Sequence, residues 1–230
     1  MAVWVRLLSL YLPLVALAVA FYALLVWFQQ PDRFPLRVVE IRSELKYLTE
    51  DEIKSTTLPF LAKGFFGFDG KGLRDALTAL PWAESVKVRR AWPDRLQVSV
   101  REHVGQAQWG KTGVLSTNGV LFFPSENAVP VGLPEFKGST VRAKEMLGQY
   151  LDLLELLAPV GLSVQTLEVT PKGVWHAVLD NGISLILGRS GLSESVARFV
   201  LAYQSRLQSK SQRVAYVDLR YTNGVAVGWK

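Results

Sequence analysis

The strongest constraint on this chain is a run of 22 uncharged residues, Leu7–Phe28, close to its N-terminus. As an α-helix the run would be about 33 Å long, enough to cross a hydrocarbon core of about 30 Å. Trp4 and Tyr11 lie at its start and Trp27 lies at its end, in the pattern of an interfacial aromatic belt. The run therefore predicts a transmembrane helix at 7–28.

A cleaved signal peptide is the alternative interpretation, with Ala18-Val19-Ala20 as its small-residue cleavage site. Cleavage there would leave Phe21–Phe28 as an apolar stub, and the apolar core of a signal peptide is usually shorter than this run. An uncleaved anchor is therefore favoured. We expect residues 1–6, which include Arg6, to be a short cytoplasmic stub and the rest of the chain to lie outside, which in a bacterium is the periplasm or the extracellular space.

Composition limits the chemistry of the rest of the chain. There is no cysteine and there are only two histidines, His103 and His176, which excludes disulfides, thiol nucleophiles and histidine-rich metal sites. The glycine-rich segment Gly64–Gly72 lacks the Lys-Ser/Thr of a P-loop. A net charge of +6 indicates attraction to anionic surfaces without selecting among them. We predict no enzymatic activity, catalytic residue, metal or cofactor, and export argues against nucleic acid as a partner.

The chain after a proline-containing linker at 29–35 predicts a small α+β unit, which we place at 36–104. Thr49-Glu50-Asp51-Glu52 is a capping box and marks the start of a helix that runs to about Leu58. Trp92-Pro93-Asp94 joins two segments of period-two alternation and predicts a hairpin. The expected order is strand, helix, helix, strand, strand. The remaining elements are a strand at Leu36–Arg42 and a helix from about Gly72 to Leu80.

The second part of the chain, 105–230, has the pattern of a mainly β unit with two helices, and Asn-Gly pairs between apolar segments predict hairpin turns. Ser193 is expected to cap the second helix, and Asn127–Ser139 reads as a loop. We also expect Val104–Trp109 to extend the preceding hairpin strand. The other expected elements are a hairpin at Gly113–Phe122, a helix at Val141–Leu157, strands at Val164–Val169, Trp175–Leu179 and Ile183–Leu187, a helix whose apolar stripe runs from Val196 to Leu207, and a terminal hairpin of Arg213–Tyr221 and Val225–Trp229.

Two longer stretches carry a resemblance to a known family. Leu80–Trp109 is similar to the end of the POTRA domain and the start of the β domain of the FtsQ/DivIB family of bacterial cell-division proteins, and Arg213–Lys230 is similar to that family's C-terminal hairpin. Leu185–Arg189 and Ala197–Val200 add weaker similarity at matching spacing. The sequence departs from the family at Gly105, where proline is common, and in the short stretch before the predicted span.

The resemblance implies an α+β fold with a single N-terminal transmembrane helix, a small POTRA domain (β-α-α-β-β) and a larger, mainly antiparallel β domain with two helices. It implies a non-enzymatic scaffold of the divisome at the division septum, which links early and late cell-division proteins. FtsB and FtsL would bind its β domain, and other divisome proteins its POTRA domain. Two alternatives stay open: a POTRA-containing envelope translocation or assembly factor, and an anchored periplasmic enzyme.

Candidate binding residues fall in two places. Lys87 and Arg89 in the first unit alternate with valines and would face away from the helices, as a recruitment surface or as an ordinary solvated face. The resemblance singles out Tyr221 as the aromatic anchor for FtsB, beside an uncovered sheet edge, unless this ring simply packs across the hairpin. The other residues placed in this binding region are Asn223, Gly224, Val225, Val227 and Trp229, with Arg220 and Lys172 as cations for acidic groups on the partner.

The predicted anchor leaves a signature in the mass of the mature protein. We expect protein extracted from membranes to retain all of Leu7–Phe28, because cleavage inside it would leave an apolar stub facing water. The measured intact mass should therefore be that of a chain that still contains this segment. A mass that begins at Phe21 would show cleavage after Ala20 and contradict the anchor.

Overall fold

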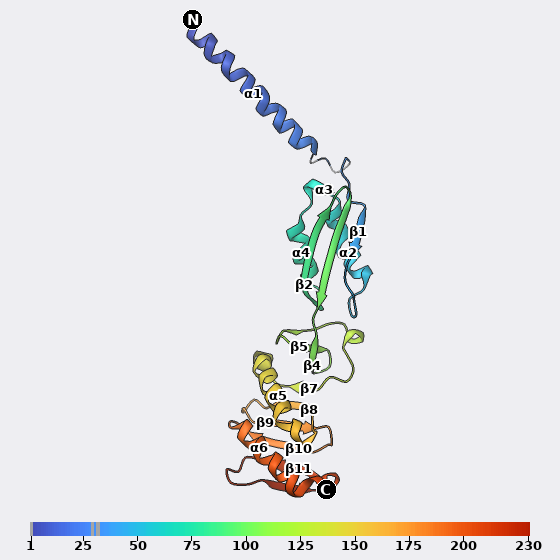
Figure 1. Ribbon diagram of the computed structural model, residues 1–230, viewed down its shortest axis with the longest axis vertical. Coiled ribbons are helices and arrows are strands. Elements are labelled where there is room, and N and C mark those ends of the chain that lie inside the picture. The colour runs from blue at the N-terminus through green and yellow to red at the C-terminus, as the bar shows by residue number, and fades with distance from the viewer. Residues whose placement is uncertain (1, 29, 31–32) are drawn as a thin grey trace. The chain divides into compact units, whose positions relative to one another are not determined.

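The computed structural model describes residues 2–28, 30 and 33–230, with side chains of the first helix described from Pro13 to Trp27 (Figure 1). The chain divides into two compact units, Met1–Glu102 and His103–Lys230. Each unit is described by itself.

The first helix, α1, extends from Ala2 to Phe28 and contains Pro13. Its described side chains are all exposed to solvent. Within the described residues, no helix combines the length and the apolarity needed to cross a membrane. The predicted span is therefore not confirmed, and the predicted linker 29–35 lies partly outside the described residues.

The remainder of the first unit has the predicted order of strand, helix, helix, strand, strand. The capping box is confirmed, because the Thr49 hydroxyl accepts a hydrogen bond from the Glu52 amide at 3.2 Å and the Glu52 carboxylate accepts one from the Thr49 amide at 2.8 Å. A short helix inside the glycine-rich segment was not predicted. The elements are β1 (Val38–Ile41), α2 (Glu50–Leu61), α3 (Gly64–Gly67), α4 (Gly70–Thr78), β2 (Ala83–Ala91) and β3 (Arg95–Glu102).

The three strands of this unit form a sheet in the order β1-β3-β2, in which β1 runs parallel to β3 and β2 antiparallel to it. The helices α2 and α4 lie on one face of the sheet (Figure 1). The apolar side chains on the inner side of these helices are completely buried with those of β3, because period-two alternation turns one side of each strand toward the helices. The buried residues at this contact include Ile53, Leu73, Leu77, Leu96 and Val98.

Glu102, the last residue of β3, joins the end of the sheet to the segment that precedes α2. Its carboxylate accepts hydrogen bonds from the backbone amides of Lys46, Tyr47 and Leu48, at 3.0, 3.0 and 2.7 Å. The Tyr47 ring stacks on Trp82 with 3.9 Å between centroids. One carboxylate thus fixes the segment that leads into α2 against the end of the sheet, since three amides on one charged acceptor form strong hydrogen bonds.

The second unit contains one nine-stranded sheet in the order β12-β11-β10-β9-β8-β7-β4-β5-β6. Five of its eight strand pairings are antiparallel, which confirms the mainly antiparallel prediction. The strands are β4 (Gly105–Trp109), β5 (Gly113–Ser116), β6 (Leu121–Phe122), β7 (Glu135–Lys137), β8 (Val164–Val169), β9 (Trp175–Leu179), β10 (Ser184–Gly188), β11 (Val214–Asp218) and β12 (Ala226–Trp229). The helices are α5 (Ala143–Leu157) and α6 (Leu192–Ala202), and α6 continues through a π-helical turn at Tyr203–Leu207 and a 3-10 segment at Gln208–Arg213.

The core of the second unit lies on the helix-covered face of the sheet. Alternate residues of each central strand, such as Trp175, Ala177 and Leu179 of β9, are buried, whereas His176 and Val178 between them are only partly covered. Side chains of α5 and α6 complete the same cluster, since both helices present apolar stripes at helical spacing. The opposite face of the sheet is therefore the open one.

Three expectations for the second unit are wrong. Val104–Trp109 does not extend the hairpin strand, because β3 ends at Glu102 and β4 pairs with β5 and β7 in the other sheet. The predicted loop contains β7, which is short and lies between two parallel neighbours. Ser193 does not cap α6; the N-cap is Gly191 in the left-handed region at φ 66°.

Replacing Glu102 by glutamine tests the role of this carboxylate. We expect Glu102→Gln to lower the free energy of unfolding by roughly 2 kcal/mol, because the neutral amide loses the charge and turns a donor toward backbone amides. Urea unfolding of the purified chain measures the change. Glu155→Gln, an exposed position on α5, is the matched control; equal stability of the two variants would contradict the role given to Glu102.

Candidate partner-binding surfaces

The C-terminal strand β12 forms one edge of the nine-stranded sheet, as predicted for a terminal strand. It pairs antiparallel with β11 and has no strand on its other side among the described residues. The opposite edge, β6, has only two residues. Because an uncovered strand presents backbone amides and carbonyls that can pair with another chain, β12 offers the longer edge for strand addition.

The apolar residues of β12 are divided between the core and solvent. Val225 and Val227 are partly buried and pack against the core, so they hold the strand in place rather than form a free apolar platform. Trp229 is 53% exposed. Gly228 lies opposite Tyr216 of β11, and a Cβ at Gly228 would overlap the Tyr216 ring. The ring therefore covers the glycine on the open side of the strand pair.

The segment between β11 and β12 places Tyr221 in solvent. Tyr221 is 59% exposed, and its ring stacks on no other ring in the described part of the chain. Asn223 and Gly224 are also exposed, and residues 221–226 line a shallow hollow. The sequence-based expectation of an accessible turn at this point agrees with this exposure.

Arg198 of α6, which the sequence did not single out, holds this segment by its backbone. One terminal guanidinium nitrogen donates to the carbonyl oxygens of Leu219 and Tyr221, at 3.2 and 3.1 Å, and to the Ser195 hydroxyl at 3.1 Å. A basic residue on a helix gives no sequence signal for a contact with a turn that follows more than twenty positions later. Arg198 is therefore a positioning residue for Tyr221.

Arg220 is paired within the chain. Its Nη2 lies 2.6 Å from Oδ2 of Asp218, and its Nε donates to Oδ1 at 2.9 Å. This hydrogen bond from Arg220 is the main reason that the pKa of Asp218 lies below its ordinary value. The stabilisation exists above the unfolded-state pKa of Asp218 and is lost as the pH falls through the lowered folded-state pKa. A partner carboxylate would have to share Arg220 with Asp218.

Arg220 and Lys172 are brought together on the open face of the sheet, although they are far apart in sequence. Both line a groove of about 470 Å³ with His176 and Ile186. Lys172 is exposed and makes no ion pair in the described part of the chain. The sequence missed His176 as a groove residue, although its position between two buried residues of β9 was the signal that could have placed it there.

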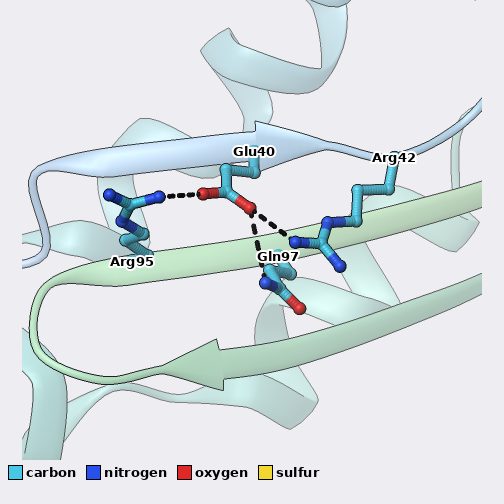
Figure 2. Close-up of polar contacts among 4 residues, drawn as sticks. All are labelled: Glu40, Arg42, Arg95 and Gln97. Carbon is cyan, nitrogen blue, oxygen red and sulfur yellow. Dashed lines mark hydrogen bonds and ion pairs between the residues drawn. The ribbon is translucent and has the colours of Figure 1, made fainter.

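On the first unit, the sheet face opposite the helices carries a carboxylate held by two arginines (Figure 2). Glu40 of β1 accepts hydrogen bonds from Arg95 at 2.7 Å, Arg42 at 3.1 Å and Gln97 at 3.3 Å. The hydrogen bond from Arg95, followed by the one from Arg42, holds the pKa of Glu40 below its ordinary value. Both arginines on the β1 side of the face are thus ion-paired with the same carboxylate.

Lys87 and Arg89 lie on the same face, on β2, the edge strand on the other side of β3. Arg89 pairs in register with Gln97, which pairs with Glu40, so Arg89 continues the row of Glu40 across the sheet, and Lys87 lies in the next row on this face, opposite Ser99. Both are exposed, whereas Val86 of the same strand, whose side chain lies on the helix side of the sheet, is buried. Neither cation makes an ion pair within the residues that the structure describes, so this edge carries unneutralised positive charge.

The described residues contain no cluster of three or more histidine, aspartate or glutamate side chains arranged to hold a metal ion.

Comparison with known proteins assigns both units. The model of the POTRA domain, FtsQ-type, matches residues 34–103, and the model of the C-terminal part of cell division protein FtsQ/DivIB matches residues 106–220. Together the two matches define a POTRA-containing cell-division protein. The chain belongs to the FtsQ/DivIB family.

Individual relatives agree with this assignment. The chain is 30% identical to the cell division protein FtsQ of Coxiella burnetii over 95% of this chain and 91% of that protein. It is 36% identical to the FtsQ protein of Aliivibrio fischeri over 89% of this chain and 80% of the relative. Identity to the FtsQ protein of Xanthomonas campestris pv. campestris is 34%, over 85% of this chain and 70% of the relative.

The contact between Gly228 and Tyr216 gives a test of how the edge strand is held. We expect Gly228→Ala to destabilise the chain by about 1 kcal/mol, because the methyl group displaces the ring. In a Tyr216→Ala background the same substitution should cost little, so the two changes should be non-additive. Urea unfolding of the four chains measures the cycle.

The control for this cycle is Gly148→Ala on α5, where a Cβ meets nothing within 4 Å. That substitution should stabilise the helix by roughly 0.5–1 kcal/mol. Additive effects of Gly228→Ala and Tyr216→Ala would show that the ring does not cover the strand.

Proposed function

We propose that this chain is a single-pass protein of the bacterial inner membrane and a non-enzymatic scaffold of the divisome at the septum. Its N-terminus lies in the cytoplasm, and its POTRA and β units lie in the periplasm. The charge-free run of the sequence and the exposed apolar side chains of α1 support the anchor. Membership in the FtsQ/DivIB family supports a role in division.

The β unit binds FtsB, in complex with FtsL, along β12. The observation that carries this proposal is the uncovered edge of β12 next to an exposed Tyr221. An added partner strand would pair with backbone groups of β12, and side-chain contacts at either end would fix its register. Tyr221 and Trp229 are the aromatic contacts, while Asn223 and Gly224 leave the turn accessible and Val225 and Val227 fix the strand from its core side.

Electrostatic pairing with acidic groups of the partner involves Lys172 and Arg220 in unequal degree. Lys172 is exposed without an ion pair in the described residues, so it is available at no cost to the fold. Arg220 is held by Asp218 and orients its guanidinium before the partner arrives. Lys172 is therefore the cation whose removal should weaken binding without altering the turn.

Truncation of Tyr221 tests the binding site on β12. Tyr221→Ala should weaken binding of a periplasmic FtsB peptide by about 30-fold, the effect of losing an interface contact worth about 2 kcal/mol. Titration of the purified chain with the peptide measures the affinity. Because the ring is exposed, the free energy of unfolding should change little.

The matched control is Phe123→Ala, since Phe123 is 57% exposed and lies next to β6 at the other edge of the sheet. Its affinity for the peptide should equal that of the parent chain. Parent affinity in Tyr221→Ala, or a loss of stability that accounts for the loss of binding, would defeat the proposed site.

The POTRA unit recruits the protein to the septum through Lys87 and Arg89, which bind an acidic surface of another divisome protein. Charge reversal of both residues should reduce mid-cell fluorescence of a tagged chain in dividing cells. Because neither side chain has an ion pair in the described residues, the variant should fold normally. Reversal of Lys144 and Lys210, two exposed cations of the β unit, is the control. Normal septal recruitment of the Lys87 and Arg89 variant would leave them as a solvated face.

A further inference from the structure

Four aromatic rings gather at one end of the POTRA unit. Phe34 lies where the chain enters the unit, Phe65 and Phe66 belong to α3, and Trp92 lies at the turn of the β2–β3 hairpin. Ring centroids are 5.2 Å apart for Phe34 and Phe66, 5.7 Å for Phe34 and Trp92, and 5.5 Å for Phe65 and Trp92. Figure 1 shows α3 and the hairpin turn at the same end of this unit.

This aromatic cluster, defined as Phe34, Phe65, Phe66 and Trp92, is only partly covered. Trp92 is 63% exposed and Phe66 is 41% exposed. The cluster is nevertheless held in place, because the Phe65 amide donates to the Phe34 carbonyl at 2.7 Å and the Arg90 guanidinium donates to the Phe65 carbonyl at 2.9 Å. A contiguous group of exposed aromatic rings that is held in place is typical of an interaction surface.

Basic side chains border the aromatic cluster. The Arg90 guanidinium lies over the Phe65 ring, 5.6 Å from its centroid. Lys63 directly precedes α3, and Arg37 is placed at the hairpin turn by a hydrogen bond from its amide to the Asp94 carbonyl at 2.9 Å. Lys63 and Arg37 are exposed. Exposed aromatic rings bordered by cations suit the headgroup layer of an anionic membrane, where aromatic residues prefer to lie and basic residues meet lipid phosphates.

The covalent chain limits where this surface can lie. Phe34 follows Phe28, the last residue of α1, by six positions. Six residues span at most about 20 Å when fully extended. If α1 crosses the bilayer, as proposed above, the aromatic cluster cannot lie farther than this from the end of the span, which is comparable to the thickness of the headgroup layer and the water next to it.

We propose that the aromatic cluster and its bordering cations dock the POTRA unit onto the anionic lipid surface of the membrane that holds α1. This inference rests on the proposed anchor. Trp92 and Phe66 enter the headgroup layer, and Arg37, Lys63 and Arg90 pair with lipid phosphates. Docking at this end leaves the outer face of the POTRA sheet, with Lys87 and Arg89, free for another protein.

Full-length chain in lipid nanodiscs tests this docking, and the absence of native cysteines permits a single fluorescent label. Ala62→Cys places the label next to Lys63, beside the aromatic cluster. Glu44→Cys places it in the exposed segment near Lys46, whose amide binds Glu102, and serves as the control. The quencher is a nitroxide attached to the lipid headgroup. Two kinds of nanodisc are compared, one that contains phosphatidylglycerol and one made of phosphatidylcholine alone.

We expect strong quenching of the label at position 62, weak quenching at position 44, and a loss of quenching at 62 when phosphatidylglycerol is omitted. The double variant Lys63→Glu with Arg37→Glu should abolish the difference in quenching between positions 62 and 44, although the aromatic rings are unchanged. Phe66→Ser with Trp92→Ser should do the same, with circular dichroism as the check on folding.

Equal quenching at positions 62 and 44 in phosphatidylglycerol nanodiscs would overturn the docking. The same result is expected if the aromatic cluster binds a protein instead of lipid. Equal quenching at position 62 in the two lipids would overturn the requirement for anionic headgroups. Failure of the anchor is a separate result, because the chain would then not co-purify with nanodiscs.

Discussion

An open sheet must end in two strands whose outer backbone groups have no partner strand, and the β unit of this chain is arranged around that constraint. One end of the sheet is reduced to the two residues of β6. The other end is β12. It pairs with β11 along one edge, and Val225 and Val227 attach it to the core on the helix-covered face of the sheet. The strand is thus fixed while its outer backbone edge stays accessible, so the proposed binding surface follows from how the sheet ends and needs no deep cavity.

Polar groups near this edge mostly serve the fold. Arg198 uses its guanidinium to hold two carbonyl oxygens of the segment that carries Tyr221, and Asp218 holds Arg220. The same division occurs on the POTRA sheet, where Glu40 holds Arg95 and Arg42. Cations that are bound in this way hold the backbone, as Arg198 does, or are themselves held by a carboxylate, as Arg220, Arg95 and Arg42 are. Those left unpaired in the described residues, among them Lys172, are the ones that a partner can engage without disturbing the fold.

The two ends of the POTRA unit differ in chemistry. At the end near the second unit in sequence, the Glu102 carboxylate binds three backbone amides and closes the sheet against the segment before α2. At the end where the chain enters from α1, aromatic rings remain exposed and cations border them. The unit therefore has a closed polar end, where Glu102 leads into the next unit of the chain, and an exposed aromatic end.

The sequence alone determined the local structure: the capping box at Thr49, the central strands β8 and β9, and α5 followed from short-range patterns of side chains, which act over a few residues. It also placed a strand at a sheet edge and Tyr221 in an exposed turn. Only the tertiary structure decided that β4 leaves the first sheet, that the three residues of β7 form a strand between two parallel neighbours, and that Arg198 and Arg220 are bound within the chain. Those outcomes depend on contacts between residues far apart in sequence, whose free energy exists only once the surrounding strands and helices have packed.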